Sequence, residues 1–535
     1  MIIDGTDKHI NLLDCTLRDG GYHVNWDFDL EFLDNYIRAL AESDVDIIEI
    51  GYRSNTTNTY KGVFAYSPDY IIDYISERSP DFQLAIMVNE SEYRHVSGIE
   101  KFNKIISTPS MKKVHIIRIA TDVDCIENSL KLAEKAKDAG YIVATNIMKC
   151  GILSNVEILK CAKKISEYSS VVDVIYIADS LGSMTPTALY NSINAIKQHW
   201  NGEIGFHSHN NNKLSLANAL IAVNTGVVWV DSTVSGLGRG AGNLATEDVL
   251  IFFKNTDSLP ISDSLLLFIE NDIEHLRSKF KWGTNIFYQL AAKKLLHPSY
   301  AQKVVESSSM NSISKNLMIS QLDNKSYIFS DDMINNARDE FLSYDGTWDA
   351  TDWCKGRRVL IVASGESAIS NNLYIEQYIN RYSPIVLALG VEMDDKYIDY
   401  YAVLSKEKFL NNRQEYLSTR KTVITPKGLF AEGEFLNNIK YYGVKVIDQE
   451  FSVDNMMCTL PYNNVLSFAV ALSIIGGASL IKCAGVDGNS THKYTNYEVN
   501  DFFNMLYKKY PEIDISSITP TSYNIKSASW LSEIL

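Results

Sequence analysis

Short apolar runs alternate with amphipathic segments along the first half of the chain. Each run is rich in valine, isoleucine and leucine, and each ends in polar residues before a segment with helical periodicity begins. Continuous apolar strands that alternate with helices are typical of a parallel sheet covered on both faces. Eight such units within about 250 residues predict an α/β fold of the (β/α)₈ type, a TIM barrel. The runs span residues 11–20, 45–53, 82–89, 113–121, 141–150, 172–180, 203–210 and 227–236.

The pattern changes twice after the predicted barrel. From residue 256 to residue 350 the periodicity is helical, which predicts a helical extension and a linker. RRVLIVASGES, residues 357–367, restarts the rhythm of strand, turn and helix, and further short apolar runs follow it. We therefore expect a second domain with a Rossmann-like, doubly wound α/β fold. The predicted domains are residues 1–255, 256–350 and 351–535.

Composition, charge and cysteine usage narrow the class of protein. Apolar residues make up 46% of the 535 residues and charged residues 21%, which is typical of a folded globular chain. Lysine and arginine number 50 against 65 aspartates and glutamates, and the formal charge of −15 argues against a nucleic acid or an anionic membrane as the main partner. The seven cysteines form no C-x-x-C pair, which disfavours a disulfide scaffold and a structural zinc site.

Two segments bear on localisation. The first residues, MIIDGTDKHINLLD, carry charges where a signal peptide needs an apolar run, so we expect a cytoplasmic protein. Residues 465–481 carry no charge, but they contain Ser467, Ser473 and the pair Gly476–Gly477. We interpret this stretch as a buried helix, a glycine turn and a strand, because a membrane span usually needs about 20 predominantly apolar residues.

Polar residues collect where the predicted strands end, and in barrels of this type the active site lies at those ends. His207 and His209 are two residues apart on the seventh strand and so face the same side. Asp19 follows the first strand, and Asn243 lies in the loop after the eighth. Two imidazoles with oxygen ligands suit Mn²⁺ or Mg²⁺, and less well Fe²⁺ or Co²⁺. The alternative interpretation is a chance pair of polar strand-end residues.

Arg18, Tyr22 and His23 flank this predicted metal site in the sequence. An arginine beside a divalent ion can hold a developing enolate oxygen, although Arg18 could also be an ordinary salt-bridge residue. Either Tyr22 or His23 could move a proton, or both could be loop residues without a chemical role. The glycine-rich loop GLGRGAGN, residues 236–243, can offer backbone N–H groups to a substrate.

Three motifs follow one another in the barrel region: LLDCTLRDGG (12–21), FHSHNNNKLSLANAL (206–220) and DSTVSGLGRGAGN (231–243). Together they resemble the metal-dependent aldolases and lyases of the DRE-TIM superfamily, and most of all its 4-hydroxy-2-oxovalerate aldolase branch. The resemblance implies that Asp19, His207 and His209 bind the metal and that Asn243 lies in or next to its shell. It also implies that a 2-oxo acid binds the metal through its carboxylate and keto oxygens, while Arg18 stabilises the enolate.

The chain departs from the motifs of this superfamily at three places. In the aldolase branch a histidine stands three residues after the metal-binding aspartate, but here that residue is Tyr22, and His23 stands four after. The Claisen-condensing branch has a glutamate two residues after the aspartate, where this chain has Gly21, so an acyl-CoA lyase or synthase is the less favoured alternative. In the aldolases a tyrosine of the helical extension reaches the site. Tyr288 is the candidate here, Tyr300 competes with it, and a core tyrosine is the other interpretation.

The second α/β domain contains a candidate nucleotide site. The turn after VLIVA contains Ser364, Gly365 and Ser367, and such a turn can present backbone N–H groups to a phosphate, although it lacks G-x-G-x-x-G and the Walker lysine. Together with NNVLSFAVALSIIGGASLIKCAGVD, which ends at Asp487, it resembles the nucleotide-sugar-binding fold of bacterial sialyltransferases and motility-associated glycosyltransferase-like proteins. A domain that serves only packing or oligomerisation is the alternative.

The sequence therefore predicts an enzyme, a divalent-metal-dependent (class II) aldolase that cleaves or forms a 4-hydroxy-2-oxo acid through a pyruvate-type enolate. Its partners would be a 2-oxo acid and an aldehyde, with a nucleotide or nucleotide sugar at the second domain. A fusion of these modules would fit bacterial surface-polysaccharide biosynthesis. A glycosyltransferase-like protein that the barrel serves is a further alternative. We expect a homo-oligomer, and whether an aldehyde-channelling dehydrogenase is a partner stays open.

Overall fold

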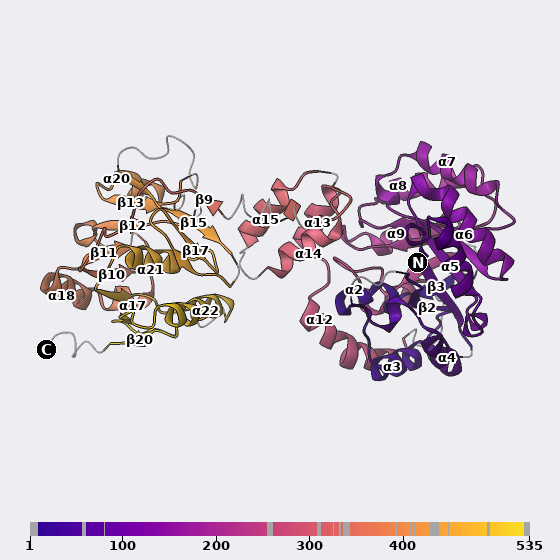
Figure 1. Ribbon diagram of the computed structural model, residues 1–535, viewed down its shortest axis with the longest axis horizontal. Coiled ribbons are helices and arrows are strands. Elements are labelled where there is room, and N and C mark those ends of the chain that lie inside the picture. The colour runs from indigo at the N-terminus through magenta and orange to yellow at the C-terminus, as the bar shows by residue number, and fades with distance from the viewer. Residues whose placement is uncertain are drawn as a thin grey trace. The chain divides into compact units, whose positions relative to one another are not determined.

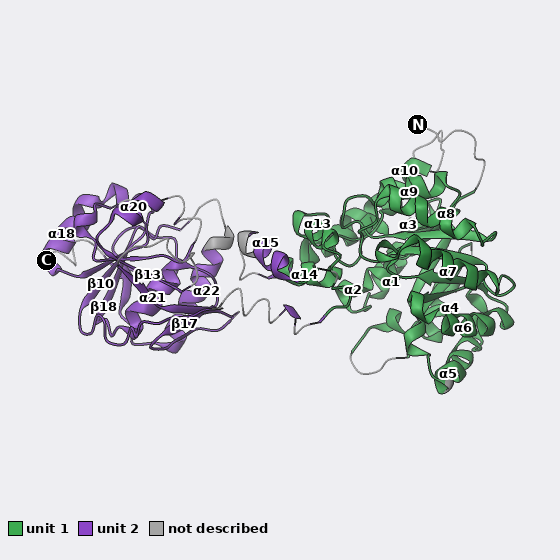
Figure 2. Cartoon of the chain, turned by 90° about the horizontal axis from the view of Figure 1, so that it is seen from above, with its two compact units in different colours: residues 1–305, 323–329 green, residues 306–322, 330–535 purple. Residues whose placement is uncertain are grey.

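The chain folds into two compact units. A computed structural model describes residues 9–55, 60–79, 81–253, 261–307, 312–324, 326–330, 333–334, 343–390, 393–405, 409, 412–427, 438–447, 449–488 and 493–528. Contacts group residues 1–305 with 323–329 as unit 1, and residues 306–322 with 330–535 as unit 2 (Figure 2). Each unit is described by itself below.

Unit 1 contains a closed barrel of eight parallel strands, so the predicted (β/α)₈ barrel is confirmed. Each of the eight apolar runs contains one strand, and the last pairs with the first through Trp229 and Asn11. The strands are β1 Asn11–Asp14, β2 Ile47–Tyr52, β3 Gln83–Asn89, β4 Ile116–Thr121, β5 Ile142–Ile147, β6 Val174–Asp179, β7 Glu203–Ser208 and β8 Trp229–Ser232. Every residue of β2, β4 and β6 is buried, as expected for strands covered on both faces.

Amphipathic helices surround the barrel strands (Figure 1). Local signals set their ends: Asp29 accepts the Phe32 N–H at the start of α3, and Ser154 and Glu157 form a capping box at the start of α7. After α6 the chain turns at Gly140, whose φ of 94° favours glycine. The helices are α3 Leu30–Ala41, α4 Asp69–Arg78, α5 Val96–Ile106, α6 Ile126–Asp138, α7 Asn155–Ser166, α8 Pro186–Lys197, α9 Ser215–Asn224 and α10 Thr246–Phe253.

The first apolar run is only partly a strand, and this difference positions the site. After Cys15, the short helix α1 (Thr16–Asp19) follows β1, and the Asp14 carboxylate accepts its first N–H, that of Thr16 (2.8 Å). A second short helix, α2 (Gly21–Val24), follows. The two turns keep the residues after β1 at the carboxyl end of the barrel instead of extending the strand.

Helices follow the barrel in unit 1, as the periodicity predicts. Phe268 of the first packs edge-on against Phe32 of α3, with ring centres 5.1 Å apart. The Trp282 indole donates to the Ser235 carbonyl (3.2 Å), which ties this segment to the loop after β8. The elements are α11 Asp263–Phe268, the π-helical turn Ile269–Ile273, α12 Glu274–Phe280, α13 Ile286–Lys293 and α14 Pro298–Glu306, while α15 (Ser312–Gln321) belongs to unit 2.

Unit 2 contains an eight-stranded parallel sheet in the order β14-β13-β12-β11-β10-β18-β19-β20, so the predicted second α/β domain is confirmed. The strand order reverses at β10, which lies between β11 and β18, and this reversal defines a doubly wound sheet. The strands are β10 Arg358–Val362, β11 Ile385–Ala388, β12 Tyr400–Ala402, β13 Thr422–Thr425, β14 Ile439–Tyr441, β18 Leu480–Ala484, β19 Ile515–Ser517 and β20 Lys526–Ser527.

A smaller sheet and further helices belong to unit 2. The sheet has the order β16-β17-β15-β9, and its strands are β9 Ser343–Tyr344, β15 Gly443–Val446, β16 Ser452–Val453 and β17 Met457–Leu460. The helices are α17 Glu366–Ser370, α18 Asn372–Tyr382, α20 Arg413–Ser418, α21 Val465–Ile475 and α22 Lys493–Lys509. The uncharged stretch 465–481 forms α21, the Gly476–Gly477 turn and the start of β18, as predicted.

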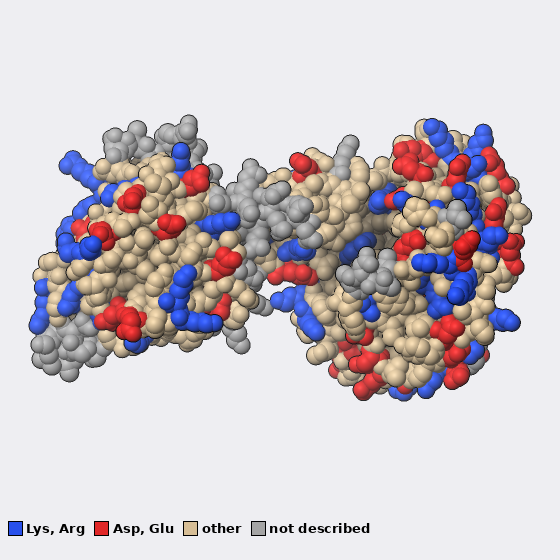
Figure 3. Space-filling view, in the orientation of Figure 1, with Lys and Arg blue, Asp and Glu red and all other residues tan. Residues whose placement is uncertain are grey.

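On the face drawn in Figure 3, basic and acidic side chains are interspersed over both units. Among the described residues, every helix is too short or too polar to cross a bilayer.

Candidate active site and metal centre

A cavity of about 170 Å³ opens at the carboxyl ends of the barrel strands. Its wall includes Arg18 and Asp19 from the turn after β1, His207 from β7 and His209 directly after it, which are four of the predicted site residues. Active sites of (β/α)₈ barrels lie at this end, because the loops there are free to vary while the strands hold the fold.

Several polar atoms converge on one carboxylate oxygen, Asp19 Oδ2. His207 Nε2 lies 3.4 Å and His209 Nε2 3.7 Å from it, and the two imidazole rings stand nearly perpendicular. Asn243 Nδ2 donates to the same oxygen (2.8 Å), and Arg18 Nη1 lies 3.5 Å away. The structure therefore brings the four predicted metal-site residues and Arg18 together.

The donor set fits a divalent cation. Two imidazole nitrogens lie 3.4 Å and 3.7 Å from one carboxylate oxygen of Asp19, and all three side chains are buried. The Asn243 Oδ1 atom is buried without a hydrogen-bond partner in the described structure, so it can serve as a fourth ligand. The Cys15 thiol lies close as well, since its sulfur, an Asp19 oxygen and a His207 nitrogen are all within 4.8 Å of one another. Burial raises the pKa of that thiol well above its ordinary value, which keeps it protonated.

The charges at the site are set by burial and by close partners. Burial raises the pKa of Asp19, but Arg18 and the two histidines outweigh it and hold that pKa well below its usual range. Burial lowers the pKa of His207, while its hydrogen bonds to Asp19 and Asp231 raise it above the ordinary value. Burial lowers the pKa of His209 to about 3, so this imidazole is neutral at pH 7.

A buried network of charged residues supports the site residues. The Asp231 carboxylate on β8 accepts the Nδ1–H of His207 (3.0 Å), which turns Nε2 toward Asp19. Arg118 on β4 bridges Asp231 (2.5 Å) and Glu49 (2.9 Å), and Glu49 also holds the Arg18 Nε (2.8 Å). Neither Arg118 nor Asp231 was predicted from the sequence as a site residue. The sequence does contain a signal for them, because each is a charged residue within an otherwise apolar predicted strand.

Asp231→Asn is expected to lower the affinity for Mn²⁺ by about 10–100-fold, because a carboxylate behind a metal-binding histidine orients the ring and raises its basicity. Titration with Mn²⁺, followed by calorimetry, measures this change. Asp73→Asn, which removes a half-exposed carboxylate paired with Lys113, is the matched control and should leave the affinity unchanged. Wild-type affinity in Asp231→Asn would contradict the positioning role.

The predicted catalytic residues do not all reach the cavity. Tyr22 lines it, and its hydroxyl lies 3.2 Å from that of Tyr52. His23 instead has its Nε2 2.9 Å from the Gly238 carbonyl oxygen and is not part of the cavity wall. Tyr288, buried on α13, and Tyr300, whose hydroxyl donates to the Ile328 carbonyl (3.0 Å), are also outside the wall.

The helical extension contributes a histidine where a tyrosine is expected. His297 lines the cavity together with Lys149 and Arg239, and none of these three residues was predicted from the sequence as a site residue. Burial lowers the pKa of His297 to about 3, and Arg239 and Lys149 act in the same direction. The Nδ1 atom of His297 accepts the Ser299 N–H (3.3 Å), so Nε2 carries the proton of the neutral ring.

In unit 2 the four predicted nucleotide-site residues lie together where the strand order reverses. Ser364 and Gly365 follow β10, and Asp487 follows β18. The Asp487 carboxylate accepts the backbone N–H (2.7 Å) and the hydroxyl of Ser367, and a Cβ on Gly365 would come within 2.6 Å of its Cγ. A protein carboxylate thus takes the N–H that a phosphate would use. Nucleotide-sugar binding here stays a prediction.

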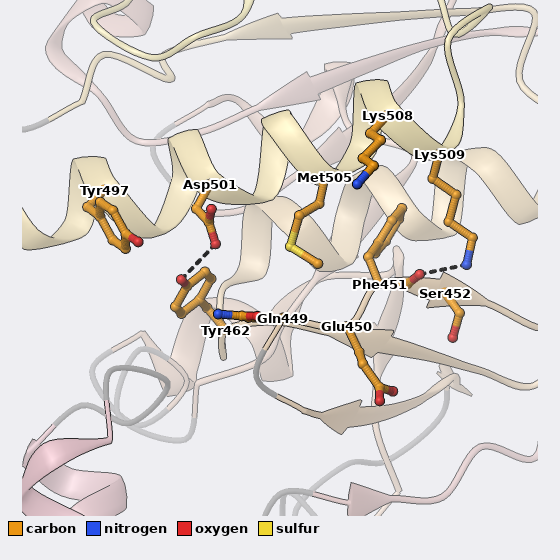
Figure 4. A pocket seen from close by; sticks show the side chains of 10 residues that line it. All are labelled: Gln449, Glu450, Phe451, Ser452, Tyr462, Tyr497, Asp501, Met505, Lys508 and Lys509. Atoms are coloured by element: carbon orange, nitrogen blue, oxygen red, sulfur yellow. Dashed lines mark hydrogen bonds between the residues drawn. The ribbon is translucent and has the colours of Figure 1, made fainter.

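A separate hollow of about 820 Å³ lies beside α22 in unit 2 (Figure 4). Two hydrogen bonds join groups of its wall, since Tyr462 donates to Asp501 (2.8 Å) and Lys509 donates to the Phe451 carbonyl (2.7 Å). The four predicted nucleotide-site residues do not line it.

Comparison with known proteins settles the family of the barrel. Residues 9–265 match the HMGL-like family model. A 4-hydroxy-2-oxovalerate aldolase of Pelotomaculum thermopropionicum is 31% identical over 249 residues, which cover 46% of this chain and 70% of that protein. The chain belongs to the HMGL-like family. A second similar protein, the 4-hydroxy-2-oxovalerate aldolase of Brevibacillus brevis, is 29% identical over 248 residues, or 45% of this chain and 69% of that protein.

A solved structure agrees with this assignment of the HMGL-like barrel. The N-terminal domain of a putative aldolase from Bacteroides vulgatus is 32% identical, with a TM-score of 0.51, and the match covers 55% of this chain and 96% of that domain. The predicted DRE-TIM resemblance is therefore confirmed, and the chain is a carbon–carbon lyase. The family match ends at residue 265, so this assignment concerns the barrel.

Proposed function

We propose that this HMGL-like lyase is a divalent-metal-dependent aldolase that cleaves or forms a 4-hydroxy-2-oxo acid through a pyruvate-type enolate. The main support is the convergence of Asp19, His207 and His209 beside Arg18 in a small cavity. Mixed nitrogen and oxygen ligands suit Mn²⁺ or Mg²⁺. The names of the similar aldolases support the same substrate class.

The bound ion would act as a Lewis acid on the carboxylate and keto oxygens of the 2-oxo acid. In cleavage, the C4 hydroxyl loses its proton, the C3–C4 bond breaks, and the electron pair of that bond moves toward the C2 oxygen. Arg18 is fixed through its Nε by Glu49 and lies beside Asp19, so its other N–H groups can donate to the charge that develops on this oxygen. Proton return to C3 releases pyruvate, and C4 leaves in the aldehyde.

Tyr22 is the better supported of the two proposed proton carriers. Its side chain lines the cavity, whereas the His23 Nε2 lies against the Gly238 carbonyl outside the cavity wall. The Nε2–H of His297 is a further donor on the same wall. A tyrosine hydroxyl positioned next to a second hydroxyl can pass a proton without leaving its place.

The size of the cavity favours the aldolase over the alternative acyl-CoA lyase or synthase. A volume of about 170 Å³ suits a small 2-oxo acid with a short aldehyde. Pockets that enclose larger ligands usually hold about 300–1,000 Å³. The Claisen-type alternative is also disfavoured because the chain has Gly21 two residues after Asp19, where the Claisen-condensing branch has a glutamate.

Deuterium exchange into the methyl group of pyruvate tests the proposal without any assumption about the aldehyde. With Mn²⁺ present we expect the NMR methyl signal to decay in D₂O, and EDTA should stop the decay, because enolate formation needs the ion. Magnesium in place of manganese is the comparison for metal preference. A folded, Mn²⁺-loaded protein that exchanges no pyruvate protons, but turns over an acyl-CoA, would favour the Claisen alternative.

A further inference from the structure

Arg239 stands out among the charged residues that line the cavity. It lies in the glycine-rich loop after β8, where Gly240 and Gly242 have φ angles of 69° and 85° and let the loop fold back on itself. Its guanidinium stacks on the Tyr22 ring, with Cζ 4.7 Å from the ring centre. Its Nε is buried without a hydrogen-bond partner in the part of the chain that the structure describes.

The other charged residues of the cavity wall have partners of opposite charge. Arg18 pairs with Glu49 (2.8 Å), Lys149 pairs with Asp122 (3.0 Å), and Asp19 faces the two histidines. Among the described residues, no carboxylate forms an ion pair with Arg239. A partly buried guanidinium without an acceptor is unfavourable, so its position suggests an anionic ligand.

With a divalent cation and one 2-oxo acid bound, the charges at the site would balance without Arg239 and leave it without a counterion. A divalent cation with the Asp19 carboxylate and two neutral imidazoles has a net charge of about +1, which the carboxylate of one 2-oxo acid neutralises. That carboxylate belongs at the ligand cluster, beside Arg18. The positive charge of Arg239 therefore remains for a second negative group. An arginine fork binds carboxylate or phosphate with two parallel hydrogen bonds.

We propose that Arg239 binds an anionic group, a carboxylate or a phosphate, on the aldehyde part of the substrate, so that the enzyme prefers 4-hydroxy-2-oxo acids carrying a second negative charge. The inference rests on the proposed aldolase function and names the substrate class of the same site. Tyr22 holds the guanidinium plane from one side. His297 lines the same cavity, and its Nε2–H is a second donor for the anion.

Binding of two 2-oxo acids of equal length tests the role of Arg239. In 2-oxoglutarate the fifth carbon is a carboxylate, and in 2-oxopentanoate it is a methyl group. Calorimetry with the Mn²⁺-loaded protein should show at least about tenfold tighter binding of 2-oxoglutarate, as expected for one charged hydrogen-bonded pair. Arg239→Gln should reduce this ratio by about 10–100-fold, and Arg239→Lys should retain part of it.

Arg78→Gln is the matched control, because Arg78 pairs with Asp34 on the surface and its loss removes the same charge from unit 1. The ratio should stay at the wild-type value in this variant. Aldol addition of pyruvate to glyoxylate and to glyceraldehyde 3-phosphate then shows which anion, carboxylate or phosphate, the enzyme uses.

Two results would overturn the inference. One is equal affinity of the wild type for the two acids, and the other is an Arg239→Gln variant that loses affinity for both equally, which would place Arg239 at the common 2-oxo acid end. Pyruvate deuterium exchange separates this failure from that of the proposed function. Exchange with no preference between the acids refutes only the inference, whereas the absence of exchange and of any binding refutes both.

Discussion

Asp19→Asn is expected to lower the rate of pyruvate exchange by about 10³-fold or more, since Lewis-acid stabilisation is worth several kcal/mol and each 1.4 kcal/mol is a factor of ten. Asparagine keeps the volume of the side chain but removes the negative charge that faces His207 and His209. The affinity for Mn²⁺ should fall together with the rate. NMR exchange rates and Mn²⁺ titrations on the same preparation measure both.

The barrel should survive this change. Arg18 keeps its ion pair with Glu49 (2.8 Å), and His207 keeps its hydrogen bond to Asp231 (3.0 Å). Circular dichroism of the variant should therefore match that of the wild type. Asp73→Asn again serves as the control, because Asp73 lies outside the cavity and pairs with Lys113 at the surface. If the Asp19→Asn protein exchanges the methyl protons of pyruvate at a tenth of the wild-type rate or faster, Asp19 is not a metal ligand.

The barrel could be predicted because each strand is a continuous apolar run that ends in polar residues. The spacing of His207 and His209 gave their common orientation, and the order of strands brought Asp19 and Asn243 to the same end. The distances confirm that these four side chains meet. Periodicity could not decide between Tyr22 and His23, because the outcome depends on how α1 and α2 turn after Asp14.

Other parts of the site leave little trace in the sequence. His297 reaches the cavity from just before α14, far along the chain from the barrel strands, so no local pattern links it to Asp19.

In unit 2, several strands have only two to four residues, such as β16 and β20, and such short segments have no measurable periodicity. Their place in the sheet depends on pairing between distant segments.

The buried pairs of Arg118 are the second feature with a large expected effect. Arg118, Glu49 and Asp231 are all fully buried, and the guanidinium lies over the Tyr176 ring with Cζ 4.3 Å from its centre. Arg118→Met keeps a long side chain but leaves Glu49 and Asp231 without their shared cation. Breaking a buried ion pair from one side costs about 3–5 kcal/mol, which corresponds to a fall in melting temperature of about 10 °C.

Calorimetric unfolding of unit 1 within the full chain measures the Arg118→Met effect, with Arg78→Met as the control. Arg78 and Asp34 are both about half exposed, so that change should cost about 0–1 kcal/mol. A second substitution identifies the cause of the loss. If the uncompensated Asp231 charge is responsible, Asp231→Asn added to Arg118→Met should recover part of the stability, although Asp231→Asn alone lowers it. Additive losses would instead assign the effect to packing around Tyr176.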